Sequence, residues 1–188
     1  MSDFTVQLKP SADEIAKLLQ SIPGAAQPAV RLSIGDALRS GRSLLASSSG
    51  IRERYNLPLS PLLAALGTPR VSGPYGVLNI EGKRIPLSVF PHSFSSVGAR
   101  VEILKGHPVY LHHAFQAGDL EGIYERDTGV GRYPIHPMVG VSIPQMAGQK
   151  EVAAKATQRI NEQLNKRMQH YISAFLKGQI QSFNLKSR

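Results

Sequence analysis

The sequence contains no cysteine and no tryptophan, and only 6% of its 188 residues are aromatic. The lack of cysteine excludes disulfides, thiolate nucleophiles, CxxC redox chemistry and every cysteine-based zinc or iron–sulfur site. No window approaches the roughly 18–20 consecutive apolar residues that span a bilayer. The first residues lack the basic region and the long apolar stretch of a signal peptide, so we expect the chain to be made and folded in a cytoplasm.

Positive charge is what the sequence has in excess. Its 22 basic and 13 acidic residues give a formal net charge of +9. The excess is concentrated in two stretches, because the net charge is −1 over residues 1–27, +3 over 28–54, +1 over 55–147 and +6 over 148–188. Such a distribution favours acidic partners, either nucleic acid or a protein surface. Its simpler interpretation is a solvated basic helix surface.

Helix signals occupy the first third of the chain. Ser11 and Glu14 have the spacing of a capping box and precede an apolar helical face. Further along, Ser60-Pro61 predict the N-cap and first residue of a short helix over 62–66, and Gly67 is expected to end that helix at its C′ position.

Between these two helices, a longer one is predicted from about Pro28 to about Tyr55. Its apolar positions recur at helical spacing, at Val30, Ile34, Leu38, Gly41 and Leu45. The stretch is rich in glycine and serine, which are poor helix formers. It is therefore interpreted as a kinked helix or one that a partner helix approaches closely, with two shorter helices as the alternative.

From Gly76 onward the apolar period changes to two, which indicates strands. Strands over 77–81 and 84–90 flank Gly82-Lys83 and predict a hairpin, in which Pro86 marks a sheet edge or a bulge. Further strands are predicted at 100–105, 107–115, 123–126, 132–135 and 139–143. The segments 68–75 and 91–99 are predicted to be a connector and a loop.

The last strong element is a helix over 150–177, with Gly178 at its C′ position. We therefore predict an α+β fold in which N-terminal helices and this long C-terminal helix pack on one face of a small, mainly antiparallel sheet. One domain is expected over 1–178, and residues 179–188 are expected to be a basic mobile tail. The domain would comprise a helical part (11–67), a sheet part (76–146) and the C-terminal helix (150–178).

Histidines and acidic residues raise two enzymatic alternatives. A metal site would need His107, His112 and His136 to converge, with Asp119 or Glu121 as oxygen ligand. The adjacent His112 and His113 point to opposite faces of a strand and cannot easily share one ion. General acid–base chemistry by Glu121, Glu125 and Asp127 would need a pocket, whereas acidic residues near a turn are usually exposed.

Nucleic-acid binding is a further alternative. Arg52 and Arg54 lie beside Tyr55 at the end of one basic helix, and the C-terminal helix supplies another basic surface. Aromatic residues rarely alternate with these cations, so a stacking platform for single strands is not indicated. The form that the sequence favours is salt-sensitive contact with the backbone of duplex DNA.

A longer pattern lies between about Ala114 and Ala147. It consists of Ala114-Phe115, Gly118, Gly122 to Arg126, Gly131-Arg132-Tyr133-Pro134-Ile135 and Val141 to Met146. This stretch resembles the minor tail protein Z family of lambda-like tailed phages and prophages, and the wider group of phage tail-completion and head–tail joining proteins. Lambda-type members carry a long arginine-rich insertion where this chain has a short, serine-rich segment, which argues against a DNA contact at that loop.

The resemblance implies a non-enzymatic structural component of a virion, with no catalytic residue, cofactor, metal or small-molecule substrate and no membrane partner. It would complete the head-proximal end of the tail and enable head–tail joining, as a ring around the DNA channel. Its location would be the tail or neck of a phage assembled in the host bacterial cytoplasm. Its partners would be other tail and neck proteins, further copies of itself, and, as an open alternative, the DNA end.

Two sets of candidate site residues follow. The first is a subunit interface on an edge strand whose proline has no ladder amide, formed by Arg132, Tyr133, Pro134 and Ile135. The second would contact acidic partners or DNA, through Arg52, Arg54, Arg159, Lys166 and Arg167. The competing classes are a sequence-independent DNA-binding accessory protein and a hydrolase that uses His112 or His113 as its base.

Overall fold

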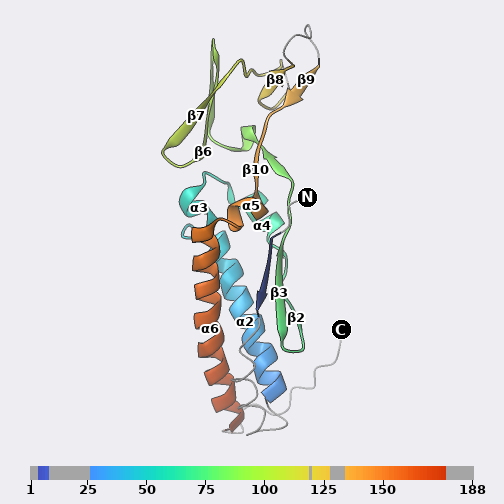
Figure 1. Ribbon diagram of the computed structural model, residues 1–188, viewed down its shortest axis with the longest axis vertical. Helices are drawn as coiled ribbons and strands as arrows, with labels where there is room; N and C mark the ends of the chain where they lie inside the picture. The colour runs from blue at the N-terminus through green and yellow to red at the C-terminus, as the bar shows by residue number, and fades with distance from the viewer. Residues whose placement is uncertain (1–3, 9–25, 119, 128–133, 177–188) are drawn as a thin grey trace. The chain divides into compact units, whose positions relative to one another are not determined.

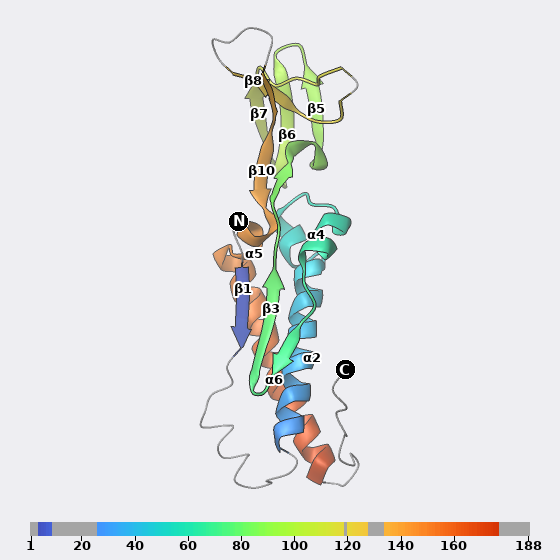
Figure 2. The same cartoon turned by 90° about the vertical axis from the view of Figure 1, so that its right-hand side faces the viewer.

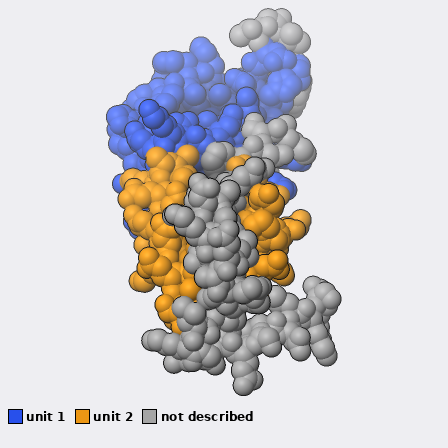
Figure 3. Space-filling view, turned by 60° about the horizontal axis from the view of Figure 1, so that its bottom comes forward, with its two compact units in different colours: residues 1–4, 45–66, 80–152 blue, residues 5–44, 67–79, 153–188 orange. Residues whose placement is uncertain are grey.

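The computed structural model describes residues 4–8, 26–118, 120–127 and 134–176. The chain divides into two compact units, coloured separately in Figure 3. Unit 1 comprises residues 1–4, 45–66 and 80–152, and unit 2 comprises residues 5–44, 67–79 and 153–188. The predicted α+β class is confirmed, with two long helices and several small antiparallel sheets. The single domain over 1–178 stays a prediction.

Unit 2 is built from two long helices and a three-stranded sheet (Figures 1 and 2). The helices are α2 (Ala26–Ala46) and α6 (Lys150–Leu176), and the strand order is β1 (Phe4–Leu8), β3 (Tyr75–Ile80), β2 (Arg70–Ser72). Strands β2 and β3 form a hairpin that turns at Gly73, which has a φ of 56°. The sequence missed β1, and it missed β2 because a three-residue strand is too short to show an alternating pattern.

Helix α2 buries the apolar face that the sequence predicted, including Val30, Ile34 and Leu38. The predicted helix to Tyr55 is wrong, because α2 ends at Ala46 and a separate short helix, α3 (Ile51–Arg54), follows. The serine-rich segment between α2 and α3 forms a local hydrogen bond between a side chain and the backbone instead of continuing the helix. The Ser47 hydroxyl accepts from the Ser49 N–H at 3.2 Å, which gives the backbone an alternative to helical bonds. Of the two alternatives, two shorter helices is the correct one.

Small residues allow close packing in unit 2, as the sequence indicated. A Cβ placed on Gly41 of α2 would lie 2.4 Å from Cγ1 of Ile160, which is fully buried on α6. On β3, a Cβ at Gly76 would lie 2.3 Å from Cγ2 of Ile34. The backbones of α2 and β3 can therefore approach their neighbours only because both positions lack a side chain. The apolar stripe of α6 is also confirmed, since Val152, Ala156, Ile160, Leu164 and Met168 are buried.

Unit 1 contains α3, α4 (Leu59–Ala65) and α5 (Ile143–Ala147), with three small sheets. The predicted N-cap at Ser60 is wrong, because α4 starts at Leu59 after Pro58. Gly67 occupies the predicted C′ position, because α4 ends at Ala65 and its C-cap residue is the extended Leu66. The N–H of Gly67 donates to the carbonyl of Asn79 at 3.0 Å. A Cβ at Gly67 would lie 2.8 Å from that carbonyl oxygen, so this residue is small because of tertiary packing.

The predicted hairpin around Gly82-Lys83 does not form. Strand β4 (Arg84–Pro86) pairs antiparallel with β10 (Val139–Ser142), and the 3-10 turn η1 (Leu87–Val89) follows it. Alternation identifies a strand but not its partner, and here the partner is distant in the sequence. The edge position predicted for Pro86 is confirmed, because β4 belongs to a two-stranded sheet whose register shifts between Val139 and Ser142.

The largest sheet of unit 1 has the order β5 (His92–Ser95), β6 (Gly98–Leu104), β7 (His107–His112). The β6–β7 hairpin turns at Gly106, with a φ of 75°, as predicted. The predicted loop over 91–99 is wrong, because β5 lies within it. The sequence did not predict β5 because all four of its residues are exposed, and a strand without a buried face shows no alternation of apolar and polar residues.

The last sheet of unit 1 pairs β8 (Tyr124–Arg126) with β9 (Ile135–Pro137). Pro144 to Met146, which belong to the pattern quoted above, lie in the short helix α5. This helix starts with a capping box between Ser142 and Gln145. Several predicted features lie outside the described residues, namely the helix after Ser11, Asp119, Arg132 and Tyr133, Gly178, and the tail at 179–188. Within the described parts of the chain, every helix is too short or too polar to cross a bilayer.

Candidate functional site

The predicted subunit-interface strand is described only in part. Arg132 and Tyr133 lie outside the described residues. Pro134 is exposed immediately before β9, and Ile135 is half-buried and pairs with Arg126 of β8. Because the sheet contains only β8 and β9 among the described residues, β9 is an edge strand, as the sequence predicted.

The two arginines of α3 both have partners within unit 1. Nε of Arg52 donates to the carbonyl oxygen of Leu57 at 3.1 Å. Nη1 of Arg54 donates to Oε2 of Glu151 at 3.2 Å, in an ion pair whose two side chains are well exposed. An exposed pair of this kind contributes little to stability. Both guanidinium groups are therefore at the surface but already engaged.

Arg167 of α6 belongs to a polar cluster centred on Asp36 of α2. The Tyr171 hydroxyl donates to Oδ2 of Asp36 at 2.8 Å, Nε of Arg167 lies 3.5 Å from the same oxygen, and Arg39 pairs with Oδ1. Partial burial raises the pKa of Asp36, but the hydrogen bonds from Arg39 and Tyr171 and the charges of Arg39 and Arg167 outweigh it and leave the pKa below its ordinary value. Burial and the Asp36 carboxylate raise the pKa of Tyr171.

Arg159 and Lys166 lie on the same helix and differ in their surroundings. Nε of Arg159 donates to the Ser40 hydroxyl of α2 at 3.1 Å, so this cation also links the two helices of unit 2. Lys166 is exposed. Of the three α6 cations predicted to meet an acidic partner, Arg159 and Arg167 thus contact α2. Sequence reasoning missed these partners, because no local pattern connects residues so far apart in the chain. Arg159 and Ser40 are separated by 119 residues, and Arg167 and Asp36 by 131.

Charge separates completely between the two units. Unit 1 contains nine basic and nine acidic residues, whereas unit 2 contains 13 basic and four acidic residues. Unit 2 therefore carries the entire net charge of +9. Among its described residues, Arg31, Arg70 and Lys166 are exposed cations on α2, β2 and α6. This distribution provides a positive field over one unit, which attracts anionic partners at long range.

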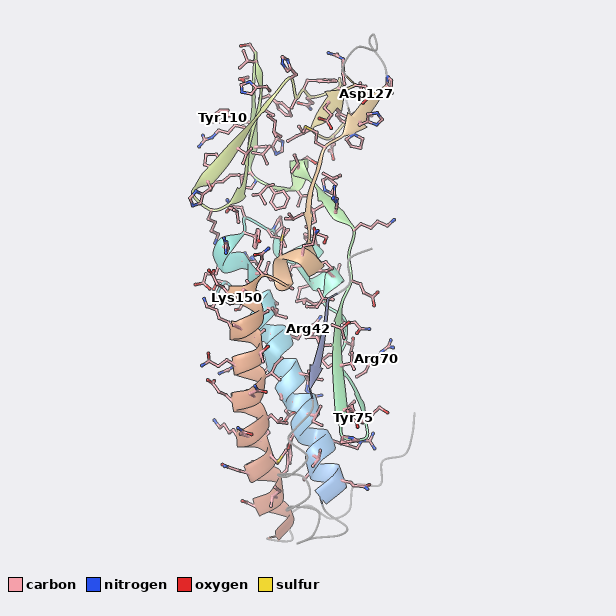
Figure 4. All side chains as sticks on the ribbon, viewed as in Figure 1. Arg42, Arg70, Tyr75, Tyr110, Asp127 and Lys150 are labelled. Carbon is pink, nitrogen blue, oxygen red and sulfur yellow. The ribbon has the colours of Figure 1, made fainter. Side chains whose placement is uncertain are left out.

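The histidines do not form the metal site considered above. Within the described ranges, no group of three or more His, Asp or Glu side chains could hold a metal ion. His136 instead lies 3.2 Å from Oδ2 of Asp127, and Glu125 pairs across the sheet with His136 (Asp127 is labelled in Figure 4). These side chains are exposed, as expected for polar groups on a surface hairpin. Of the residues considered for acid–base chemistry, Glu125 lies on β8, Asp127 directly follows it, and Glu121 lies outside the strands. All three side chains are exposed.

Unit 1 contains arginine–aromatic contacts that the sequence did not predict. The guanidinium carbon of Arg126 lies 4.2 Å from the ring centre of Phe115, and that of Arg100 lies 6.0 Å from the ring centre of Tyr110. Arg100 and Tyr110 are register partners on β6 and β7, and Tyr110 is 65% exposed (Figure 4). Such pairs favour a fixed orientation of the guanidinium group. Only the strand register could have revealed them.

Exposed apolar side chains also gather on unit 1. They occur on the edge strands β5 and β7, at the turn between β5 and β6, and on β10, namely Phe94, Val97, Val109, Tyr110, Val139 and Val141. Edge strands present backbone groups that can pair with another chain. An open strand edge can pair with a partner strand, and exposed apolar side chains beside it would be buried in that contact.

Comparisons with protein-family models, with curated proteins and with solved structures find no match to this chain. The resemblance of residues 114–147 to phage tail-completion proteins therefore stays a prediction that depends on the sequence pattern.

Proposed function

We propose that this protein is a structural component of a tailed phage or prophage particle. It completes the head-proximal end of the tail and enables head–tail joining, as a ring of subunits around the DNA channel. The observation that best supports this proposal is the complete separation of charge between the two units. Assembly proteins must contact several partners at once, and here each unit offers a different kind of surface.

Unit 1 supplies the contacts with other subunits or tail proteins that depend on strand pairing and apolar packing. It is electrically neutral, and its small sheets end in edge strands with exposed apolar side chains. Neutral, apolar edges suit contacts between subunits or with neighbouring tail proteins, because little charge must be desolvated. The edge strand β9 begins at the half-buried Ile135, and the exposed Pro134 directly precedes it.

Unit 2 supplies the electrostatic contact. Its charge of +9 favours an acidic neck or tail protein, and it would also attract the DNA end. Because Arg159 and Arg167 contact α2, we assign the outward contacts chiefly to Arg31, Arg70 and Lys166.

Gene disruption followed by complementation tests this proposal. Without the protein, electron microscopy should show filled heads and full-length tails that remain separate, and the intact gene should restore joined particles. Replacing Arg31, Arg70 and Lys166 together by glutamine should reduce joining. The matched control removes three exposed cations from unit 1, at Lys83, Arg84 and Lys150, and should join normally. Infectious particles that lack the protein would refute the proposal.

A DNA-binding accessory protein is the competing function, and the charge of unit 2 also favours it. Phosphate contacts would make affinity for a short duplex fall by about three decades or more between 50 and 200 mM salt. If such binding occurs while heads and tails join normally without the protein, the accessory function replaces the structural one.

A further inference from the structure

Strand β5 of unit 1 has an open edge. It pairs only with β6 among the described strands, and all four of its residues are exposed. The N–H of Glu102 donates to the carbonyl of Pro91, and His92 through Ser95 pair in register with Val101 through Gly98. Because bonded and non-bonded pairs alternate in an antiparallel ladder, the backbone groups of His92 and Phe94 point away from β6. They are available to another strand.

An open depression lies at each end of this strand. One, of about 630 Å³, includes His92, Arg52 and Lys105 in its lining. The other, of about 650 Å³, includes Phe94, His112, His113 and Arg126. His92 lines the first depression and Phe94 the second, and their rings contact edge to face with centres 5.6 Å apart. Neither depression is lined by an aspartate or a glutamate among the described residues.

The second depression holds its cation in a fixed orientation. Arg126 lies over the ring of Phe115 at 4.2 Å and has no carboxylate partner among the described residues. The neighbouring carboxylates lie elsewhere, because Glu125 pairs with His136 on the opposite face of β8 and Asp127 also contacts His136. A stacked guanidinium with free N–H groups is well suited to bind a carboxylate with two hydrogen bonds.

We propose that β5 is the docking site for an extended, acidic segment of another protein. The segment adds as a further strand beside β5, bonds to the backbone of His92 and Phe94, and places carboxylates in the two depressions. Four residues of strand span about 10–13 Å, so carboxylates roughly four residues apart would reach both ends. This site goes beyond the proposed virion function: β5 is one of the unit 1 edges assigned above to contacts with other proteins, and the binding test below assumes no particle.

Charge complementarity favours a different protein over a second copy of this chain. The edge strands that a copy could offer from the same sheet are β5 and β7, and neither contains an aspartate or a glutamate. A copy that paired through this sheet would therefore leave Arg126 and Lys105 without anionic partners. An acidic segment satisfies the backbone and the cations together.

Peptide binding to the full chain tests this site. The probe is a blocked synthetic peptide with a four-residue core of alternating valine and threonine and two glutamates at each end, and its binding is measured by fluorescence anisotropy. Saturable binding is expected. A peptide with glutamine in place of every glutamate should bind about tenfold or more weakly. A peptide N-methylated at alternate core residues, on the edge that faces β5, should also fail, because it cannot donate to the strand.

Variants of the protein separate recognition of the carboxylates from backbone pairing with β5. Arg126→Gln should weaken binding of the acidic peptide about tenfold, whereas Arg84→Gln, which removes an exposed cation of unit 1 outside both depressions, should change it less than about twofold. Phe94→Pro removes an outward N–H without breaking the bonds to β6, and it should bind more weakly than Phe94→Ala.

Three results would overturn the proposal. The first is equal binding of the glutamate and glutamine peptides, which would exclude carboxylate recognition. The second is equal binding of the N-methylated peptide, which would exclude strand addition without altering the protein. The third is self-association that Phe94→Pro abolishes while no peptide binds, which would make a second copy the occupant of β5.

Discussion

The contact between Gly41 and Ile160 gives a prediction in which two glycines of one helix have opposite effects. Replacing either glycine of α2 by alanine favours the helix by up to about 1 kcal/mol. At Gly35 the new Cβ would meet only the Arg39 guanidinium at 3.7 Å and Val71 at 3.8 Å, which are ordinary contacts. Gly35→Ala should therefore stabilise the protein by about 0.5–1 kcal/mol.

Gly41→Ala should instead destabilise the protein. Its Cβ would lie 2.4 Å and 2.6 Å from two side-chain carbons of Ile160, a distance at which α2 and α6 must separate. Overpacking of a buried contact costs about 1–3 kcal/mol, which exceeds the gain in helix propensity. We expect a net loss of about 1–2 kcal/mol in the free energy of unfolding, equivalent to a fall in Tm of about 3–6 °C.

Urea denaturation followed by circular dichroism measures these free energies, and a double variant tests the cause. Ile160→Ala should cost about 2–5 kcal/mol by leaving a cavity. In that background the nearest remaining atom to the new methyl group is the Cβ of residue 160, at 4.0 Å, so Gly41→Ala should become stabilising. The reasoning fails if Gly41→Ala stabilises the unaltered protein as much as Gly35→Ala does.

Three further predictions concern stability. The folded state lowers the pKa of Asp36, so its ionised form contributes stability that is fully present above the unfolded pKa of about 3.9 and is lost as pH falls through the lower folded value. The pH dependence of Tm below pH 4 should therefore be weaker in Asp36→Asn than in the unaltered protein. At pH 7 this substitution should lower the free energy of unfolding by about 1–2 kcal/mol. Ser142→Ala removes the capping box of α5 and should lower the free energy of unfolding by about 1 kcal/mol in urea titrations, whereas an unchanged midpoint would contradict this role. Gly98→Ala would place a Cβ 2.2 Å from the Leu111 carbonyl at a φ of 153°, so proteolysis of the β6–β7 region should become faster than in the unaltered protein.

Local pattern located the two long helices of this protein, but it determined neither the end of α2 nor the partners of the strands. The apolar spacing of α2 and α6 was sufficient because a helix closes its hydrogen bonds within the segment that forms it. Strand partners are not encoded in the same way. Residues 84–86 alternate like one arm of a hairpin, yet they pair with residues 139–142. The hairpin that contains β3 turns at Gly73 instead of Gly82.

The candidate sites show the same division. From the sequence alone came the excess of basic residues, the edge strand at Ile135 and the small residues of α2. Tertiary structure decided which cations remain available, because folding brings Asp36 to Arg167 and Ser40 to Arg159 across two helices. It also decided that the net charge falls entirely in unit 2 and that Arg126 stacks on Phe115. Electrostatic and stacking energies depend on distance in space, and only the folded chain sets that distance.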